Sequence, residues 1–503
     1  MTLTKVPKNL MRFLVVRVLM ALLLFITFAA WSMSSAVGGS PDEDFVLTSI
    51  WCGSEGNPPY CRKDVDRPSA MILPIMAAEP SLCLQQLGAD YSAKCQESIY
   101  NQEISTDLFN DDLYPTRYFE VQRNLVSNDV EVSVLKMRFL NSLIAAVLVV
   151  VATSLYKNTN LDMLFFWLIA ITPVSSYLIT SINTSSWALI GTSCFVFALV
   201  SRPQSSVNLK LDFLAILFAT LSLWISNSSR SESKFSIFIL LLVIYLSKSD
   251  FSKAKLPKVF LKATATALVL ICFVYVALKS LGTYDFFTRQ RSISDREIKV
   301  SAENLIIQNL LNLPRFFTGF FGSWGLGSFE LKLTSTAWLF AFQGFIIIAI
   351  FTYLKSSKHL RFVFCTLFVI MFFAILCAHQ YKFLIIGEQI QPRYFLPFFL
   401  GAVIIVSSNK SAPFPNSLVM ISAILATTSN SIALRDTIRR YTTGRDVLIS
   451  KSINDPLEWW WRIGPQPETV WLSGSLAFAA LFTIVACEQG NLKASRIQNV
   501  SQA

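Results

Sequence analysis

Three consecutive carboxylates, Asp42, Glu43 and Asp44, are the residues of this sequence that most directly suggest chemistry. Neighbouring carboxylates repel one another, and partial burial would raise the pKa of at least one of them. Such a group can accept a proton from a hydroxyl as a general base, or supply oxygen ligands to a divalent cation. A solvated acidic turn is the alternative explanation. The pattern predicts Asp42, Glu43 or Asp44 as catalytic, with a divalent cation as a candidate cofactor and its ligands unassigned.

Three arginines form a second candidate group, because each is expected at the outer end of an apolar helix. Arg138 and Arg393 begin apolar stretches, and Arg230 lies between two of them. Basic residues usually mark the cytoplasmic side of a membrane, so an arginine on the outer side needs a partner. Because Arg binds phosphate through paired hydrogen bonds, a phosphate leaving group or an anionic lipid would suit. A salt bridge to the acidic loop is the alternative.

Polar side chains that interrupt apolar stretches form a third group. Asn183 and Trp187 lie at one expected outer turn, and Gln391 and Tyr394 at another. Polar groups near membrane depth usually face the bundle interior or a cavity, although they can equally cap helices. We therefore expect these four residues to contribute to substrate binding beside the arginines.

The elements that must position these residues are predicted to be membrane-spanning helices. Of the 503 residues, 53% are apolar and only 15% are charged, whereas a soluble domain averages about 25% charged residues. A crossing needs about 20 mostly apolar residues. The candidate spans are 13–36, 139–155, 161–182, 187–200, 213–225, 235–246, 259–281, 337–354, 362–378, 394–407, 417–428 and 470–487. The sequence therefore predicts an all-α polytopic membrane protein with about twelve helices.

The first apolar run and the basic residues predict the topology. A run of about 24 residues exceeds the 7–15 of a signal peptide, which favours a retained first span. The short inner connections carry Lys and Arg with few acids, which predicts cytoplasmic N- and C-termini. The expected segments are 1–36 (N-terminus and first helix), 37–134 (acidic outer loop), 135–281 (helices 2–7), 282–334 (outer loop), 335–430 (helices 8–11), 431–469 (outer loop) and 470–503 (last helix and tail).

The large first loop differs from the rest of the chain in charge and in cysteine content. Residues 38–133 hold sixteen Asp or Glu and six Lys or Arg, whereas the remainder is strongly basic. Four cysteines in an exported segment suggest two disulfides rather than a zinc site. The sequential pairs Cys52–Cys61 and Cys83–Cys95 are the simplest of three connectivities.

Two further features bear on possible partners. The run Trp459–Trp461 is expected either to lie at headgroup depth as an interfacial belt or to stack on a sugar. The inner connections are short and contain no P-loop or GxGxxG turn, so no nucleotide-binding domain is predicted. The positive charge mostly marks inner membrane edges, which argues against nucleic acid and leaves the lipid bilayer as the expected partner.

Six segments, taken together and in order, resemble a known family. They are Pro41-Asp42-Glu43-Asp44 with Ile50-Trp51-Cys52; Met137-Arg138-Phe139-Leu140-Asn141; Thr172-Pro173 with the stretch from Ser181 to Trp187; Ser229-Arg230-Ser231-Glu232; Gly319-Phe320-Phe321-Gly322-Ser323-Trp324-Gly325; and Gln391-Pro392-Arg393-Tyr394-Phe395-Leu396-Pro397. This series resembles a bacterial family of polytopic membrane proteins of unknown function that is common in actinobacteria. Two positions depart from the family pattern: no histidine follows Asp44, and Pro392 stands where glycine is usual.

That family is in turn remotely similar to the GT-C glycosyltransferases, which use polyprenyl-phosphate sugars. The resemblance implies that Asp42, Glu43 or Asp44 deprotonates an acceptor hydroxyl, and that Arg138, Arg230 or Arg393 holds the donor phosphate. It adds Glu232 to the substrate-binding residues and places the chain in a bacterial plasma membrane. The expected function is sugar transfer to a cell-envelope acceptor on the outer face. A transporter or flippase of lipid-linked saccharide and a non-enzymatic envelope-assembly scaffold are the alternatives.

Overall fold

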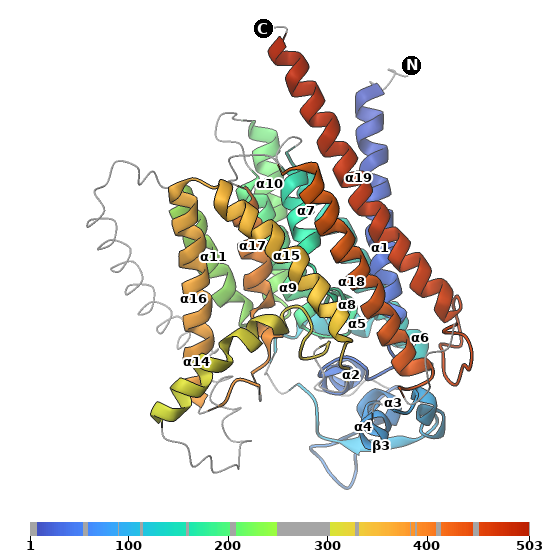
Figure 1. Ribbon diagram of the computed structural model, residues 1–503. Coiled ribbons are helices and arrows are strands. Elements are labelled where there is room, and N and C mark those ends of the chain that lie inside the picture. The colour runs from blue at the N-terminus through green and yellow to red at the C-terminus, as the bar shows by residue number, and fades with distance from the viewer. Residues whose placement is uncertain are drawn as a thin grey trace.

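The chain folds into a bundle of helices with a smaller layer of loops, short helices and strands at one end (Figure 1). Both termini lie at the opposite end, which we call the terminal end; the end that carries the small layer is the loop end. This computed structural model describes residues 8–53, 59–88, 90–110, 114–156, 160–201, 208–248, 302–326, 331–382, 384–387, 390–408, 414–445 and 452–501.

Seven helices in the described residues are long and apolar enough to cross a membrane. They are α1 (Lys8–Met33), α6 (Val130–Ser154), α10 (Leu209–Asn227), α15 (Ser335–Lys355), α16 (Lys358–Lys382), α18 (Asn416–Thr442) and α19 (Pro467–Ser501). Shorter apolar helices accompany them: α9 (Ser185–Val200), α11 (Ser233–Lys248), and η3 (Pro392–Phe395) continuing into α17 (Leu396–Ser408). The chain is thus a multi-pass membrane protein, while the number twelve stays a prediction because 259–281 lies outside the described residues.

The span predicted at 161–182 is sharply bent. The chain forms α7 (Asn160–Ala170) and α8 (Pro173–Thr180), which meet at an angle of 94°. Thr172 precedes a proline, which disfavours helical backbone, and its hydroxyl accepts a hydrogen bond from the backbone N–H of Ser175 at the start of α8. Counted as one crossing, this bent pair raises the number of candidate spans to eight.

α18 is longer than its hydropathy indicates. The apolar stretch ends near Thr428, but the helix continues to Thr442. Tertiary contacts stabilise this polar extension: Ser429 donates to the carbonyl of Ala337 at 2.7 Å, and Asn430 accepts from the Trp31 indole at 2.9 Å. Residues 431–442, predicted as loop, are therefore helical.

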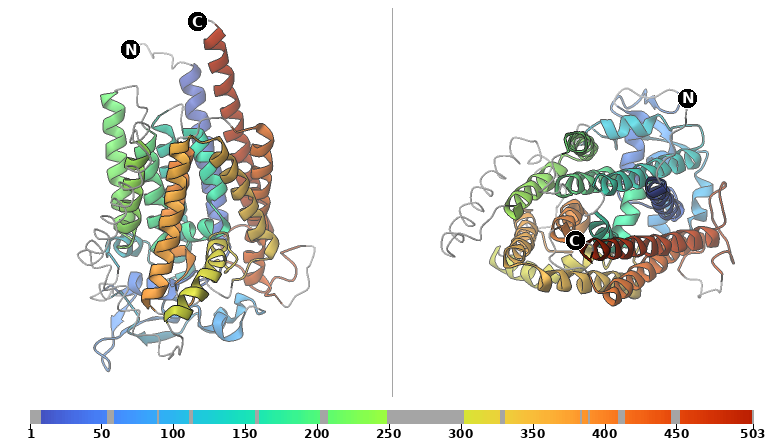
Figure 2. Two further views of the ribbon diagram at one scale, coloured as in Figure 1. Left: turned by 60° about the vertical axis from the view of Figure 1, so that its left-hand side comes forward. Right: turned by 90° about the horizontal axis from the view of Figure 1, so that it is seen from above.

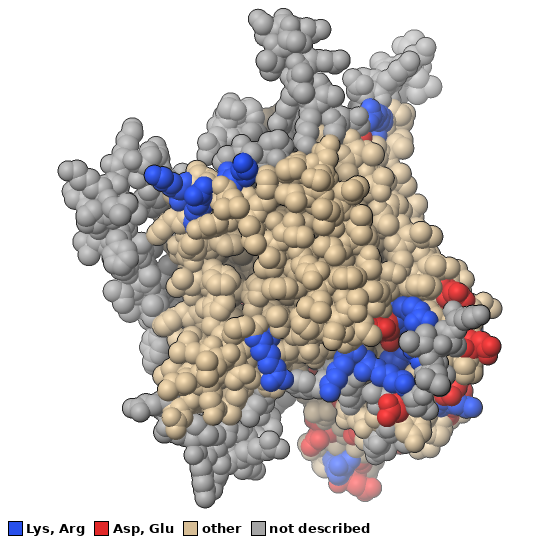
Figure 3. Space-filling view, in the orientation of Figure 1, with Lys and Arg blue, Asp and Glu red and all other residues tan. Residues whose placement is uncertain are grey.

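The helices pack side by side around a shared apolar core (Figure 2). α1 packs against α6 and α19, α9 against α10 and α17, and α15 against α18. The visible flank of the bundle over α15, α16 and α18 is a broad belt without charged side chains, bordered by charges toward both ends (Figure 3). This distribution is typical of a lipid-facing surface.

A glycine sets the distance between α9 and α10. A Cβ on Gly191 would lie 2.6 Å from the backbone nitrogen of Ser226 and 2.7 Å from the carbonyl oxygen of Ser222. Small residues allow such close approach between membrane helices. We expect Gly191→Ala to lower the free energy of unfolding by about 1–3 kcal/mol, because the two backbones must separate. Thermal unfolding in detergent measures this. Gly344→Ala is the control, since its nearest neighbour would lie at 3.3 Å; an equal loss in both variants would contradict the explanation.

The loop end is a small mixed layer. It contains the helices α2 (Glu43–Cys52), α3 (Ile75–Ala78), α4 (Leu82–Leu87), η1 (Ala93–Ser98) and α5 (Arg117–Arg123). The strands β1 (Arg62–Lys63), β2 (Met71–Pro74) and β3 (Glu103–Thr106) form an antiparallel sheet in that order. α14 (Ala302–Gly319) lies at the same end of the bundle (Figure 1). Disulfides join Cys52 to Cys61 and Cys83 to Cys95, which confirms the predicted pairing.

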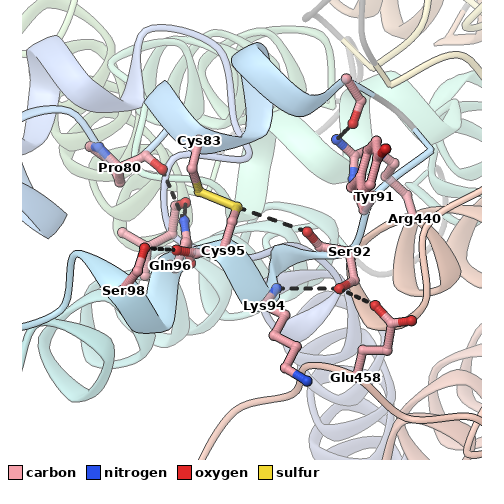
Figure 4. Close-up of a disulfide and its surroundings, with 12 residues drawn as sticks. Pro80, Cys83, Tyr91, Ser92, Lys94, Cys95, Gln96, Ser98, Arg440 and Glu458 are labelled. Atoms are coloured by element: carbon pink, nitrogen blue, oxygen red, sulfur yellow. Dashed lines mark hydrogen bonds between the residues drawn. A yellow bond between two sulfur atoms is a disulfide. The ribbon is translucent and has the colours of Figure 1, made fainter.

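Polar contacts beside the second disulfide fix this layer to the bundle (Figure 4). The Gln96 amide donates to the carbonyls of Val37 and Pro80 at 2.6 and 3.0 Å. Arg440, in the extension of α18, donates to the carbonyls of Gly88 and Tyr91. The layer is therefore held against the ends of both α1 and α18.

Two members of the run Trp459–Trp461 have a different role from the two that were predicted. Trp459 and Trp461 are 5% and 4% exposed, so neither an interfacial belt nor a sugar-stacking surface fits them. The Trp461 indole donates to the carbonyl of Met33 at 2.8 Å and its ring lies 5.6 Å from the Arg138 guanidinium. These two tryptophans therefore pack the core at the loop end of α1.

Candidate functional site

Asp42 occupies an unusual backbone position directly before α2. Its φ of 58° is the only positive value among the described residues other than glycine. Asp tolerates this left-handed region better than most residues, and such conformations cluster at functional sites. The Asn183 amide holds the turn by donating to the carbonyl of Pro41 at 2.6 Å. The turn thereby presents a carboxylate whose side chain is 42% exposed.

The Asp42 carboxylate contacts an arginine far away in the sequence. Nη2 of Arg393 lies 2.9 and 3.1 Å from the two carboxylate oxygens. Arg393 belongs to η3, and its side chain is only 4% exposed. The outer arginines were expected to bind either a phosphate or a carboxylate of the acidic loop. Arg393 forms a salt bridge of the second kind.

A second buried arginine, Arg230, lies in the turn between α10 and α11. Its guanidinium donates to the Ser185 hydroxyl at 2.6 Å and to the Tyr114 hydroxyl at 3.3 Å. Its Nε lies 3.6 Å from the Glu232 carboxylate. Burial raises the pKa of the Tyr114 phenol, with Arg230 opposing that shift, so this hydroxyl stays neutral.

The two arginines share one aromatic ring. The guanidinium carbons of Arg230 and Arg393 lie 5.1 and 5.2 Å from the centre of the Tyr394 ring, within the range of a cation–π contact. We call the set Asp42, Tyr114, Arg230, Glu232, Arg393 and Tyr394 the arginine cluster. It combines two buried cations with two carboxylates that come from different turns of the fold.

The cluster has unused hydrogen-bonding capacity. Both oxygens of the Glu232 carboxylate are buried, and among the described residues neither accepts a hydrogen bond. A cavity of about 10 Å³ adjoins Arg393, which is room for one water molecule. Its wall is formed by Val174, Gly319, Trp324, Gly325, Gln391, Pro392 and Arg393. Gln391 thus lies beside the cluster, where the motif 319–325 meets the motif 391–397.

Asp44 faces other partners. One of its oxygens accepts from the backbone N–H of Phe45 at 2.9 Å, and the other faces the Ser81 hydroxyl at 3.4 Å. Burial, with the charges of Asp42 and Glu43, raises the pKa of Asp44. The Asp44 carboxylate therefore contacts the loop layer and, within the described part of the chain, neither arginine of the cluster.

Glu43 and Arg138 form a buried ion pair of their own. Both side chains are at most 1% exposed, and Nη2 of Arg138 lies 2.8 and 2.9 Å from the Glu43 carboxylate oxygens. Arg138 also donates to the carbonyls of Ser32, Ser35 and Ala36, at and just beyond the end of α1. Buried in this way, the two side chains have no open path to a substrate, so the predicted catalytic and phosphate-binding roles do not suit them.

Trp187 also lies apart from the cluster. It is 3% exposed, and its indole donates to Asn141 at 3.0 Å. Its ring packs edge-on against Tyr118 of α5. Trp187 therefore joins α9 to the loop layer, and a substrate could not reach it without displacing this packing.

Tyr114 and Ser185 are members of the site that were not among the predicted site residues. Ser185 belongs to the polar turn that contains Asn183, so its neighbourhood was a usable signal. Tyr114 stands in a loop with no periodic pattern, and no feature of the sequence marks it. Both were found only because the fold brings their hydroxyls to Arg230.

The divalent cation suggested by the three consecutive carboxylates does not fit their geometry. Asp42 points to Arg393, Glu43 to Arg138, and Asp44 to Phe45 and Ser81. Across the described part of the chain, no group of three or more His, Cys, Asp or Glu side chains converges on a possible metal position.

A helical membrane bundle that carries a disulfide-bonded layer over buried arginines is the class of protein that this fold and site define. The model of the predicted membrane protein family DUF2142 matches residues 25–402, and the chain belongs to this family. The match includes every residue of the arginine cluster. No curated protein matches the chain, and no solved structure does.

Proposed function

We propose that this protein is a membrane glycosyltransferase that moves a sugar from a polyprenyl-phosphate donor to a hydroxyl of a cell-envelope acceptor. The observation that carries the proposal is the pairing of an exposed carboxylate, Asp42, with a buried arginine, Arg393, beside a second arginine. A carboxylate base and a cationic phosphate site are the two groups that such a transfer requires.

The reaction is a single displacement. The acceptor oxygen attacks C1 of the donor sugar, the bond from C1 to the phosphate oxygen breaks, and its electron pair leaves with the polyprenyl phosphate. The proton of the acceptor hydroxyl passes to the Asp42 carboxylate. Arg393 and Arg230 stabilise the charge on the leaving phosphate, since guanidinium–phosphate hydrogen bonds are charge-assisted.

The surrounding residues position these groups. Asn183 holds the turn that presents Asp42, through the carbonyl of Pro41. Glu232 and Tyr394 orient the two arginines. Gln391 lines the small cavity beside Arg393. Glu43, Arg138 and Trp187 support the fold around the site.

We place the loop end on the outside of a bacterial plasma membrane, with both termini in the cytoplasm. The disulfides of the loop layer support this orientation, because such bonds persist in oxidising compartments. Lys355, Lys358 and Arg361, at the corner between α15 and α16 near the terminal end, follow the positive-inside rule.

Reconstitution of the purified protein into vesicles tests the proposal. With a polyprenyl-phosphate sugar labelled in the sugar and an envelope glycan fraction as acceptor, we expect label to leave the lipid and appear in the glycan. Passage of intact labelled lipid across the bilayer would instead identify a flippase. If label neither transfers nor crosses, with donor and acceptor shown competent, the glycosyltransferase proposal is wrong and a scaffold role replaces it.

A further inference from the structure

We infer that the ion pair with Arg393 keeps the Asp42 carboxylate from acting as a base until a phosphate-bearing ligand replaces it on the arginine. We call this ion pair the lock. The lock rests on the proposed function, because it assigns the freed carboxylate the role of base. It adds an order of events: Asp42 becomes available to an acceptor hydroxyl only when a phosphate occupies Arg393.

The two partners differ in exposure and in how firmly the fold holds them. Arg393 is 4% exposed, whereas Asp42 is 42% exposed and lies over it. The segment carrying Arg393 is tightly packed, since a Cβ on Gly319 would lie 2.4 Å from Pro392. Asp42 stands on a left-handed turn, a conformation that costs free energy for a residue with a side chain. The carboxylate is therefore the part that can move.

The charges of the cluster favour exchange of the carboxylate for a phosphate. The two guanidinium groups flank one ring, so they repel each other unless anions lie close to them. The Asp42 carboxylate contacts only Arg393 of the two, whereas a phosphate offers three or more oxygens. A phosphate can accept paired hydrogen bonds from one arginine and still face the other.

The hydrogen bonding of Asp42 gives the lock its chemical consequence. Both carboxylate oxygens accept from Nη2 of Arg393. While they do so, one lone pair on each oxygen is directed at the guanidinium, and the carboxylate is held over Arg393 in the place that the phosphate has to take. Displacement by phosphate releases these lone pairs, and the base becomes available in the same step that seats the leaving group.

The lock predicts that removing the carboxylate strengthens phosphate binding. We expect Asp42→Asn to bind farnesyl phosphate about tenfold more tightly than the unaltered protein, the effect of losing an internal competitor worth about 1.4 kcal/mol. Asparagine keeps the size of aspartate and accepts a left-handed backbone. Asp42→Gly removes the side chain without backbone strain and should show the same gain. Titration calorimetry of the purified full-length protein in detergent measures both.

Three ligands and two further variants complete the experiment. Inorganic phosphate, farnesyl phosphate and phosphatidylglycerol in mixed micelles are titrated separately; a gain with all three identifies the phosphate group as sufficient, and a gain with farnesyl phosphate alone identifies a prenyl-linked ligand. Arg393→Gln should abolish the binding. Glu103→Gln removes an exposed carboxylate that pairs with Arg62 and should leave the affinity unchanged.

The outcomes separate the lock from the glycosyltransferase itself. If the unaltered protein transfers sugar but neither Asp42 variant binds any of the three ligands more tightly, the lock is overturned and the proposed function stands. If the variants bind farnesyl phosphate more tightly but the unaltered protein transfers no sugar, the proposed function fails and the exchange of anions on Arg393 stands.

Discussion

Asp42→Asn is expected to slow sugar transfer by about 10²–10⁴-fold, the usual contribution of a positioned general base. The amide keeps the shape of the side chain but cannot accept the proton of an acceptor hydroxyl. Because asparagine tolerates a positive φ, the turn before α2 should remain intact. Initial rates in reconstituted vesicles measure the loss, at equal amounts of folded protein.

Asp44→Asn is the matched control for this prediction. Asp44 lies two residues away in the same acidic run, but its carboxylate hydrogen-bonds with Phe45 and Ser81 and, among the described residues, with neither arginine of the cluster. We expect it to retain most of the transfer rate. The opposite pattern, full activity in Asp42→Asn and loss in Asp44→Asn, would assign the base to Asp44, whose raised pKa also suits proton transfer.

The sequence was sufficient to select most members of the arginine cluster but not to pair them. Asp42, Arg230, Arg393 and Tyr394 were predicted from acidic, basic and aromatic residues at apolar edges, and Glu232 from the family resemblance. Asp42 and Arg393 are separated by 351 positions. Which carboxylate pairs with which arginine depends on how α1, α6 and η3 pack, and residue type alone does not predict that packing.

Residue type was equally insufficient to separate functional from structural polar groups. Glu43 and Asp42 are adjacent acids, yet one is fully buried against Arg138 and the other is half-exposed. Trp187 and Asn183 belong to one polar turn, but the tryptophan packs on Tyr118 while the asparagine holds the Asp42 turn. Burial decides these roles, and burial follows from the tertiary structure.

The helices themselves were predicted where hydropathy alone determines them. α1, α6, α15 and α16 fall where long apolar runs place them. The prediction missed the bend within 161–182 and the polar extension of α18. A local hydrogen bond to Thr172 caps the start of α8, and a tertiary hydrogen bond to Asn430 stabilises the polar extension of α18. A window average of hydropathy does not contain that information.

Arg138→Met is expected to lower the free energy of unfolding by about 3–5 kcal/mol, because it leaves the Glu43 carboxylate buried without its partner. It also removes one donor from each of three carbonyls at and just beyond the end of α1. Unfolding in detergent and the yield of membrane-inserted protein measure the effect. Arg62→Met, which breaks an exposed ion pair with Glu103, should change stability little.

The double variant Glu43→Gln with Arg138→Met distinguishes a buried ion pair from a catalytic pair. Removing both charges avoids the cost of one uncompensated buried ion, so the double variant should be more stable than Arg138→Met alone. Its transfer rate per folded molecule should stay close to that of the unaltered protein, because neither side chain is open to a substrate. If the double variant is stable but transfers no sugar, then Glu43 or Arg138 takes part in the reaction, and the assignment of this pair to a purely structural role is wrong.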